Sequence, residues 1–158
     1  MTKVLLRRAL LSGIVLFLAI QFVPYGWDRT NPPVRQEPAW DSRQTRELAV
    51  RACFDCHSND TRWPWYSTMA PMSWIVQHDV ERGRRMLNYS EWDRPQEVAH
   101  ESVEAVERGT MPPRHYGVAR LSAAERQSLI HGLGATFDKG QERLSVGRGG
   151  AATTTVAE

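Results

Sequence analysis

The segment Cys53-Phe54-Asp55-Cys56-His57 constrains this chain more than any other feature of its sequence. It holds both cysteines of a 158-residue chain, and a histidine follows the second cysteine directly. Two cysteines three positions apart lie on one face of a helical turn, which brings their thiols to the same side. The fold must therefore present two thiols and an adjacent imidazole to one common surface.

Three chemistries use such a set of side chains. In covalent haem attachment, each thiol adds to one vinyl group on the same edge of the porphyrin, and His57 coordinates the iron. A redox-active dithiol uses the same cysteine spacing, but usually on a βαβ framework that this sequence does not show. Zinc requires four ligands, and no second cysteine–histidine pair stands at a suitable spacing. We interpret the motif as a haem attachment site, with the dithiol and zinc as alternatives.

An iron held by His57 has a second face, for which the sequence offers several methionines and histidines. Met111 stands in the segment RGTMPPRHYG, where two prolines restrict the backbone, so little entropy is lost in aiming its sulfur at iron. We predict Met111 as the second axial ligand. His115 on the same loop and Met69 are alternatives, as is an open or water-bound site. The other candidates are expected to pack or to face solvent within helices: Met72, Met86, His78, His100 and His131.

The pattern of apolar residues and caps predicts a small all-α domain of about four helices around one haem. No segment shows the alternation of a half-buried strand. Capping residues place the helix boundaries. The first helix is expected to start at Asp41 or Ser42 and to run into the cysteine motif, and the second to start near Pro71. The third should have Pro95 in its first turn and be closed by Gly109, a single residue in the left-handed conformation. The fourth should open with Ser122 and Glu125 and end before Gly134.

Aromatic residues follow the cysteine motif closely, and four of the six tryptophans fall within one third of the chain. Such side chains either fill a core or line a pocket for a large flat ligand. We predict that some of them contact the haem, that Arg62 pairs with a haem propionate, and that Asn59 stabilises the turn after the motif. The predicted haem contacts are Trp63, Trp65, Tyr66 and Trp74.

The N-terminus carries Lys3, Arg7 and Arg8, followed by an uncharged apolar run from Ala9 to Val23. A basic start before an apolar run predicts a transmembrane helix with its N-terminus in the cytoplasm, and a cleaved signal peptide is the alternative. Either one delivers the rest of the chain to the periplasmic side of a bacterial inner membrane, where covalent haem attachment is possible.

The chain is expected to divide into four parts. Residues 1–27 form the membrane anchor or signal peptide, 28–41 a proline-rich linker, 42–144 the haem-binding domain, and 145–158 a disordered tail. The 20 basic and 18 acidic residues are interspersed, and the net charge of +2 indicates no nucleic-acid partner.

Several of these segments resemble known families. CFDCH, GTMPP and the closing stretch LSAAERQSLIHGL resemble a small class I c-type cytochrome. The stretch from Cys56 to Trp92, CHSNDTRWPWYSTMAPMSWIVQHDVERGRRMLNYSEW, resembles the bacterial haem-binding domain family, whose members are short and begin with one membrane anchor. The resemblance covers residues 43–133. It implies one haem c attached to Cys53 and Cys56, with His57 as axial ligand and Met111 at the position of the second axial ligand.

From these features we expect a periplasmic electron carrier with His/Met-ligated iron, and not an enzyme. Its redox partners are not evident from the sequence. The alternative is a haem-based sensor or small-ligand-binding protein, in which the sixth ligand is displaceable or absent. A periplasmic thiol oxidoreductase is a third hypothesis.

Overall fold

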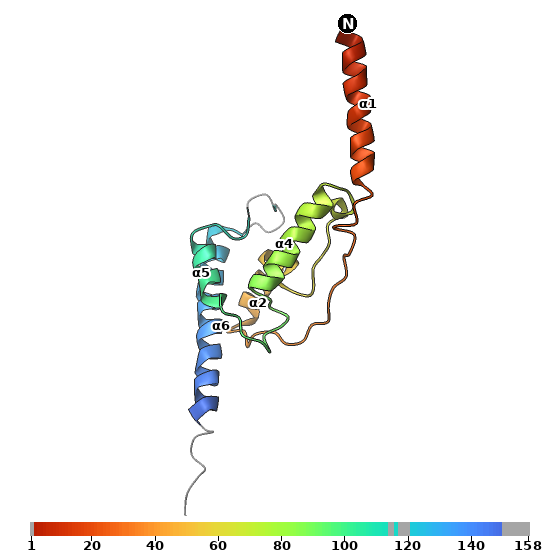
Figure 1. Ribbon diagram of the computed structural model, residues 1–158. Helices are drawn as coiled ribbons and strands as arrows, with labels where there is room; N and C mark the ends of the chain where they lie inside the picture. The colour runs from red at the N-terminus through yellow and green to blue at the C-terminus, as the bar shows by residue number, and fades with distance from the viewer. Residues whose placement is uncertain (1, 114–115, 117–120, 150–158) are drawn as a thin grey trace, which may run out of the picture.

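The computed structural model describes residues 2–113, 116 and 121–149, with backbone only beyond residue 139. Within these residues the chain is helical and no strand is present, apart from an isolated bridge between Gln36 and Glu91 (Figure 1). This confirms the all-α fold class. The helices are α1 Thr2–Ile20, α2 Arg43–Ala52, α3 Phe54–His57, the 3-10 helix η1 Trp65–Thr68, α4 Met72–Met86, α5 Ala99–Glu107 and α6 Ala123–Gly149.

Local capping explains where most of these helices begin. The Ser42 side chain accepts a hydrogen bond from the backbone N–H of Thr45 at the start of α2 (3.1 Å). Ser122 and Glu125 exchange two hydrogen bonds in a capping box at the start of α6, each satisfying a backbone N–H of the first turn. Gly109 closes α5 at a φ of 70°, in the left-handed conformation predicted for it.

Two boundaries differ from the prediction because tertiary contacts decide them. The third helix starts at Ala99 and not at Pro95, since the Gln96 side chain accepts from the N–H of Asn88 and donates to the carbonyl of Glu91, which holds this segment in a turn. The fourth helix continues past Gly134, because Phe137 is buried against Trp92 one turn further on (5.5 Å between ring centroids).

The core lies where α2, α5 and α6 meet the aromatic residues that follow α4. At the crossing of α2 and α6 the backbones come close, since a Cβ atom on Gly132 would lie 2.8 Å from the Cβ of Thr45. The rings of Phe54, Tyr89, Trp92 and Phe137 stack in series at 5.5–6.0 Å. The buried apolar core residues are Leu48, Ala49, Phe54, Leu87, Tyr89, Ala99, Val106, Leu129, Leu133 and Phe137.

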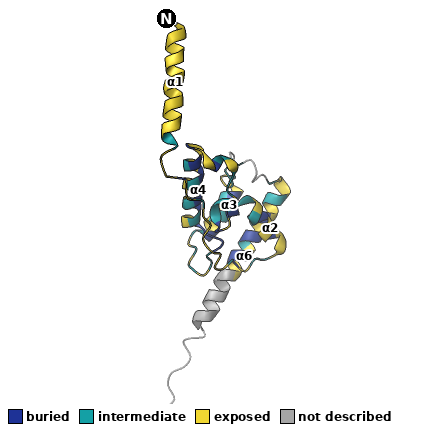
Figure 2. Cartoon of the chain, turned by 90° about the vertical axis from the view of Figure 1, so that its right-hand side faces the viewer, coloured by how far each residue is buried: buried dark blue, intermediate teal, exposed yellow. Residues whose placement is uncertain are grey.

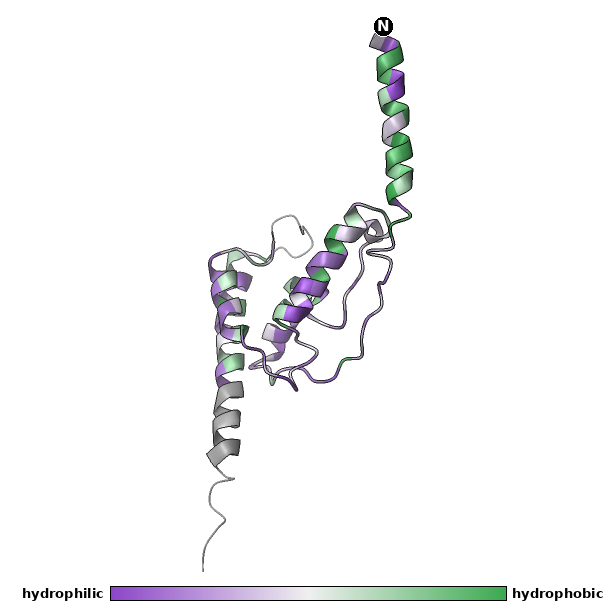
Figure 3. Ribbon diagram, viewed as in Figure 1, coloured by the Kyte–Doolittle hydropathy of each residue, from purple (hydrophilic) through white to green (hydrophobic). Residues whose placement is uncertain are grey.

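Helix α1 projects from the body, and its apolar side chains are exposed on all sides (Figures 2 and 3). Among the residues that the structure describes, no helix is sufficiently long and apolar to span a bilayer. The predicted transmembrane helix within residues 1–27 is therefore not supported, although the segment is helical.

The segment 28–41 lies along the body without regular structure. Arg29 donates to the carbonyl of Ser67 (3.1 Å), and the N–H of Arg35 donates to the carbonyl of Ser90 (2.9 Å). These bonds place it against the body and not as a free spacer. At the other end, α6 extends to Gly149, into the segment predicted as a disordered tail, and residues 150–158 lie outside the described part of the chain.

Candidate functional site

The cysteine motif forms a tight helical turn between α2 and α4. The N–H of Cys53 donates to the carbonyl of Ala49 at the end of α2, and the N–H of His57 donates back to Cys53 (2.8 and 2.9 Å). Both cysteines are free and half-buried, and they line a cavity of about 400 Å³. Residues of α4 and α5 form two of its walls, including Asp79, Gly83 and Met86 from α4 and Ser102, Ala105 and Val106 from α5.

The imidazole of His57 is oriented by two backbone carbonyls. Its Nδ1 lies 3.1 Å from the oxygens of both Gly83 and Leu87. Because a carbonyl oxygen only accepts, Nδ1 carries the proton and the lone pair of Nε2 is free. Burial lowers the pKa of His57, although these two hydrogen bonds oppose the shift, so the ring is held in its neutral form. A neutral imidazole with a fixed tautomer is the form that ligates iron.

Gly83 allows α4 to approach the cysteine motif closely. A Cβ atom on Gly83 would lie 2.9 Å from the carbonyl carbon of Cys56 and closer still to its oxygen, both of which are backbone atoms. Only glycine lets the helix come near enough for its carbonyl to reach His57. Sequence reasoning missed this residue, although a glycine in the interior of a predicted helix was the available signal.

Met111 lines the same cavity from the segment that follows α5, whereas His57 is held from the α4 side. Its N–H donates to the carbonyl of Ala105 (3.1 Å), and its own carbonyl accepts from Arg126 (3.4 Å). Its side chain is partly exposed, at 39%. The structure thus brings Cys53, Cys56, His57 and Met111 to one cavity.

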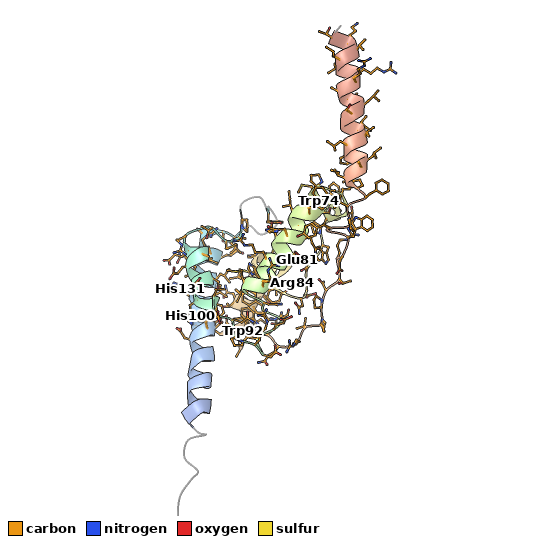
Figure 4. All side chains as sticks on the ribbon, viewed as in Figure 1. Trp74, Glu81, Arg84, Trp92, His100 and His131 are labelled. Atoms are coloured by element: carbon orange, nitrogen blue, oxygen red, sulfur yellow. The ribbon has the colours of Figure 1, made fainter. Side chains whose placement is uncertain are left out.

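The other candidate axial ligands are placed as follows. Met86 also lines the cavity, but from α4, the helix that supports His57. His100 on α5 packs edge-on against Phe137, with 5.8 Å between ring centroids. His131 lies on α6, and neither histidine lines the cavity (Figure 4). Met69, Met72 and His78 are exposed and do not line it, and His115 lies outside the described residues.

A model of the haem-binding domain family matches residues 15–135. This span includes all the residues that line the cavity. The chain belongs to the haem-binding domain family. No curated protein and no solved structure matches it.

The cavity fits the ligand that this family binds. Its volume lies within the range of about 300–1,000 Å³ usual for ligand pockets, and most of its lining is apolar. The donor set combines two thiols, an imidazole with a free Nε2 and a thioether, which are the groups that attach and ligate a haem c. Among the described residues, no group of three or more histidine, cysteine, aspartate or glutamate side chains is arranged to hold a metal ion by itself, so the zinc alternative gains no support.

The state of the thiols disfavours the redox-active dithiol. Burial raises the pKa of Cys53 to about 12 and that of Cys56 to about 11, with a smaller contribution from nearby negative charge. Reactive dithiols require the opposite, a thiol pKa lowered by positive charge or a helix N-terminus.

The predicted aromatic contacts with haem find little support in this geometry. The indole N–H of Trp63 donates to Asn31, Trp65 is 76% exposed, and Trp74 lies near the start of α4 (Figure 4). None of these three lines the cavity, and Tyr66 lines a small neighbouring one. The tyrosines that line the cavity beside the cysteine motif are Tyr89 and Tyr116, which sequence reasoning missed.

The predicted roles of Arg62 and Asn59 have different outcomes. Arg62 does not line the cavity; it forms a two-pronged ion pair with Asp55 (3.0 and 3.2 Å). The cavity is instead lined by three other arginines, Arg51, Arg82 and Arg108.

Asn59 stabilises the turn after the motif, as predicted. Its N–H donates to the Ser90 hydroxyl, its side-chain amide donates to the carbonyl of Pro33, and its side-chain oxygen accepts from Asn88 (2.8–2.9 Å). Arg84 adds a bond from its guanidinium to the carbonyl of Ser58 (2.8 Å; Figure 4). These bonds fix the exit of the chain from the turn of the cysteine motif.

Proposed function

We propose that this chain is a monohaem c-type cytochrome that carries electrons between periplasmic partners. The observation that carries this proposal is the single cavity lined by Cys53, Cys56, His57 and Met111. The first three residues come from one turn, whereas Met111 reaches the cavity from beyond α5. The cavity therefore has the two thiols on one side, and the two proposed iron ligands, His57 and Met111, come from separate segments.

Covalent attachment follows from the chemistry of the free thiols. Each S–H bond adds across one vinyl group, so that the sulfur bonds to carbon and the proton ends on the neighbouring carbon, with no oxidant or reductant consumed. Cys53 and Cys56 are unpaired in the structure, as this addition requires. The turn that holds them is itself fixed by the bonds of His57 and Asn59.

Ligation by His57 and Met111 supports electron transfer over catalysis. A bound haem supplies a one-electron couple, and the protein controls its potential through the axial ligands and burial. His57 is orientated by the carbonyls of Gly83 and Leu87, and Met111 by its backbone bond to Ala105. With two protein ligands, no coordination position is left for a substrate, so we do not propose an enzyme.

A haem-stained denaturing gel and an intact mass measurement test covalent attachment. The chain, produced with the haem-attachment machinery, should retain haem through denaturation, and its mass should exceed that of the polypeptide by one haem. Replacing Cys53 and Cys56 together by alanine should abolish the stained band, while Arg43→Gln, which removes the exposed ion pair with Glu47 and changes no residue that lines the cavity, should leave it intact. A wild-type chain with free thiols and the bare polypeptide mass would refute the proposal.

A haem-based sensor or small-ligand-binding protein is the second candidate. The partial exposure of Met111 favours it, because an exposed ligand can be displaced. Carbon monoxide added to the reduced protein separates the two functions. Rapid and complete binding supports the sensor, and refusal supports the electron carrier.

We further propose that the N-terminal segment directs the haem domain to the periplasm. Lys3, Arg7 and Arg8 precede an apolar helix whose side chains are exposed, as in a segment that engages the export machinery. Fractionation of a producing bacterial cell tests this proposal. Haem-stained protein in the periplasmic or membrane fraction supports it, and recovery only from the cytoplasm contradicts it.

A further inference from the structure

A hydrogen bond joins α4 to the segment that follows Met111, at the wall of the cavity. The hydroxyl of Tyr116 donates to Oδ2 of Asp79 at 2.7 Å, across 37 positions of sequence. Tyr116 belongs to the segment that follows Met111, and Asp79 lies on α4 one turn before Gly83. Both side chains also line the cavity. The bond therefore connects the segment of one proposed iron ligand to the helix that orients the other.

Tyr116 stands five positions after Met111 in the sequence. Pro112 and Pro113 follow Met111 directly and fix two φ angles. The N–H of Tyr116 donates back to the carbonyl of Pro113 (3.1 Å), which holds its backbone close to the prolines. Because so few positions separate the two residues, a restraint on the Tyr116 side chain also limits how far Met111 can lie from it.

The chemistry of the pair favours a persistent bond. Burial and the neighbouring carboxylate raise the pKa of Tyr116, so its hydroxyl stays protonated and remains the donor. A hydrogen bond to an ionised acceptor is shorter and about twice as strong as one between neutral groups.

We propose that Tyr116 and Asp79 are positioning residues that keep Met111 within reach of the haem iron and thereby oppose its replacement by external ligands. This inference rests on the proposed ligation by Met111. The pair biases an equilibrium between a Met111-bound form and a released form, and an external ligand binds only the released form. Its apparent affinity then depends on the fraction of protein with Met111 released.

Imidazole titration of the ferric holoprotein, followed by absorbance, tests this inference. Tyr116→Phe should lower the apparent Kd for imidazole by about tenfold, which corresponds to about 1.4 kcal/mol. Asp79→Asn should lower it by a smaller factor, because an amide oxygen still accepts a neutral hydrogen bond. Tyr25→Phe is the matched control, since it removes another tyrosine–carboxylate bond to α4, that of Tyr25 with Glu81, away from the cavity. It should leave the Kd unchanged.

The Met111→Ala background separates positioning from general loosening of the domain. In that background Met111 no longer competes, so adding Tyr116→Phe should not change the imidazole affinity further. An unchanged Kd in Tyr116→Phe, or an equal tenfold effect with and without Met111, would overturn the inference. A haem with a methionine ligand is expected to show a sulfur-to-iron charge-transfer absorption band. If Met111→Ala leaves both this band and the imidazole affinity unchanged, the proposed ligation by Met111 is wrong, and the inference that rests on it is wrong as well.

Discussion

Gly83 offers the sharpest test of how α4 supports the turn of the cysteine motif. In Gly83→Ala, the new methyl carbon would lie 2.9 Å from the carbonyl carbon of Cys56, about half an ångström inside the ordinary contact distance of 3.4 Å. The carbonyl oxygen is closer still. Because both atoms belong to the backbone, no side-chain rotation relieves the contact. Helix α4 must move away from α3 instead.

The cost of this movement can be estimated from its parts. Overpacking of a well-packed region costs about 1–3 kcal/mol. Moving the Gly83 carbonyl away from Nδ1 of His57, now at 3.1 Å, weakens a hydrogen bond that contributes about 1 kcal/mol. The better helix propensity of alanine returns about 1 kcal/mol. We therefore expect Gly83→Ala to lower the free energy of unfolding by about 1–3 kcal/mol.

Urea unfolding of the holoprotein, followed by far-ultraviolet circular dichroism, measures this change. Gly134→Ala is the matched control, because this glycine also lies within a helix but a Cβ atom there meets nothing within 4 Å. That variant should be more stable than the wild type by about 0.5–1 kcal/mol. Equal stability of the two alanine variants would show that α4 does not rest on the Cys56 backbone. In Gly83→Ala the reduction potential should also rise, since His57 loses part of the hydrogen bonding that makes it a better donor to iron.

Two further predictions concern α6. A Cβ atom on Gly132 would lie 2.7 Å from Cγ2 of Thr45, so Gly132→Ala should lower the free energy of unfolding by about 1–3 kcal/mol. Adding Thr45→Ala should restore part of this loss. A Gly132→Ala variant as stable as the wild type would contradict the close crossing of α2 and α6. Hydrogen bonds from the backbone N–H of Ser122 and then from Arg51 lower the pKa of Glu125 to about 2. The ionised Glu125 side chain therefore contributes its full stabilisation above the usual pKa of 4.5, and this contribution disappears as the pH falls through about 2. Glu125→Gln should therefore be less stable than the wild type in urea at pH 7, with a difference that narrows toward pH 2, and a difference independent of pH would contradict this assignment.

The turn that holds the cysteine motif and most helix boundaries follow from the sequence because they depend on neighbours within one or two turns. The spacing of Cys53, Cys56 and His57 brings their side chains to one cavity, and caps such as Ser42 and Gly109 act on the backbone beside them. Met111 also lines this cavity, and its ligation of iron stays a prediction that rests on the prolines beside it.

Only the tertiary structure decided which distant residues meet around that turn. Arg62 was predicted to pair with a propionate, but in the fold it forms an ion pair with Asp55. The tryptophans after the motif lie beside the cavity residues in sequence, whereas Tyr89 and Tyr116 arrive at its wall from other segments. Such pairings depend on how the helices pack against one another, and helical periodicity reveals which face of a helix is apolar but not which helix will cover it. The sequence therefore determined the groups proposed to hold the haem, and the packing of α4, α5 and α6 determined the walls of the cavity that these groups line.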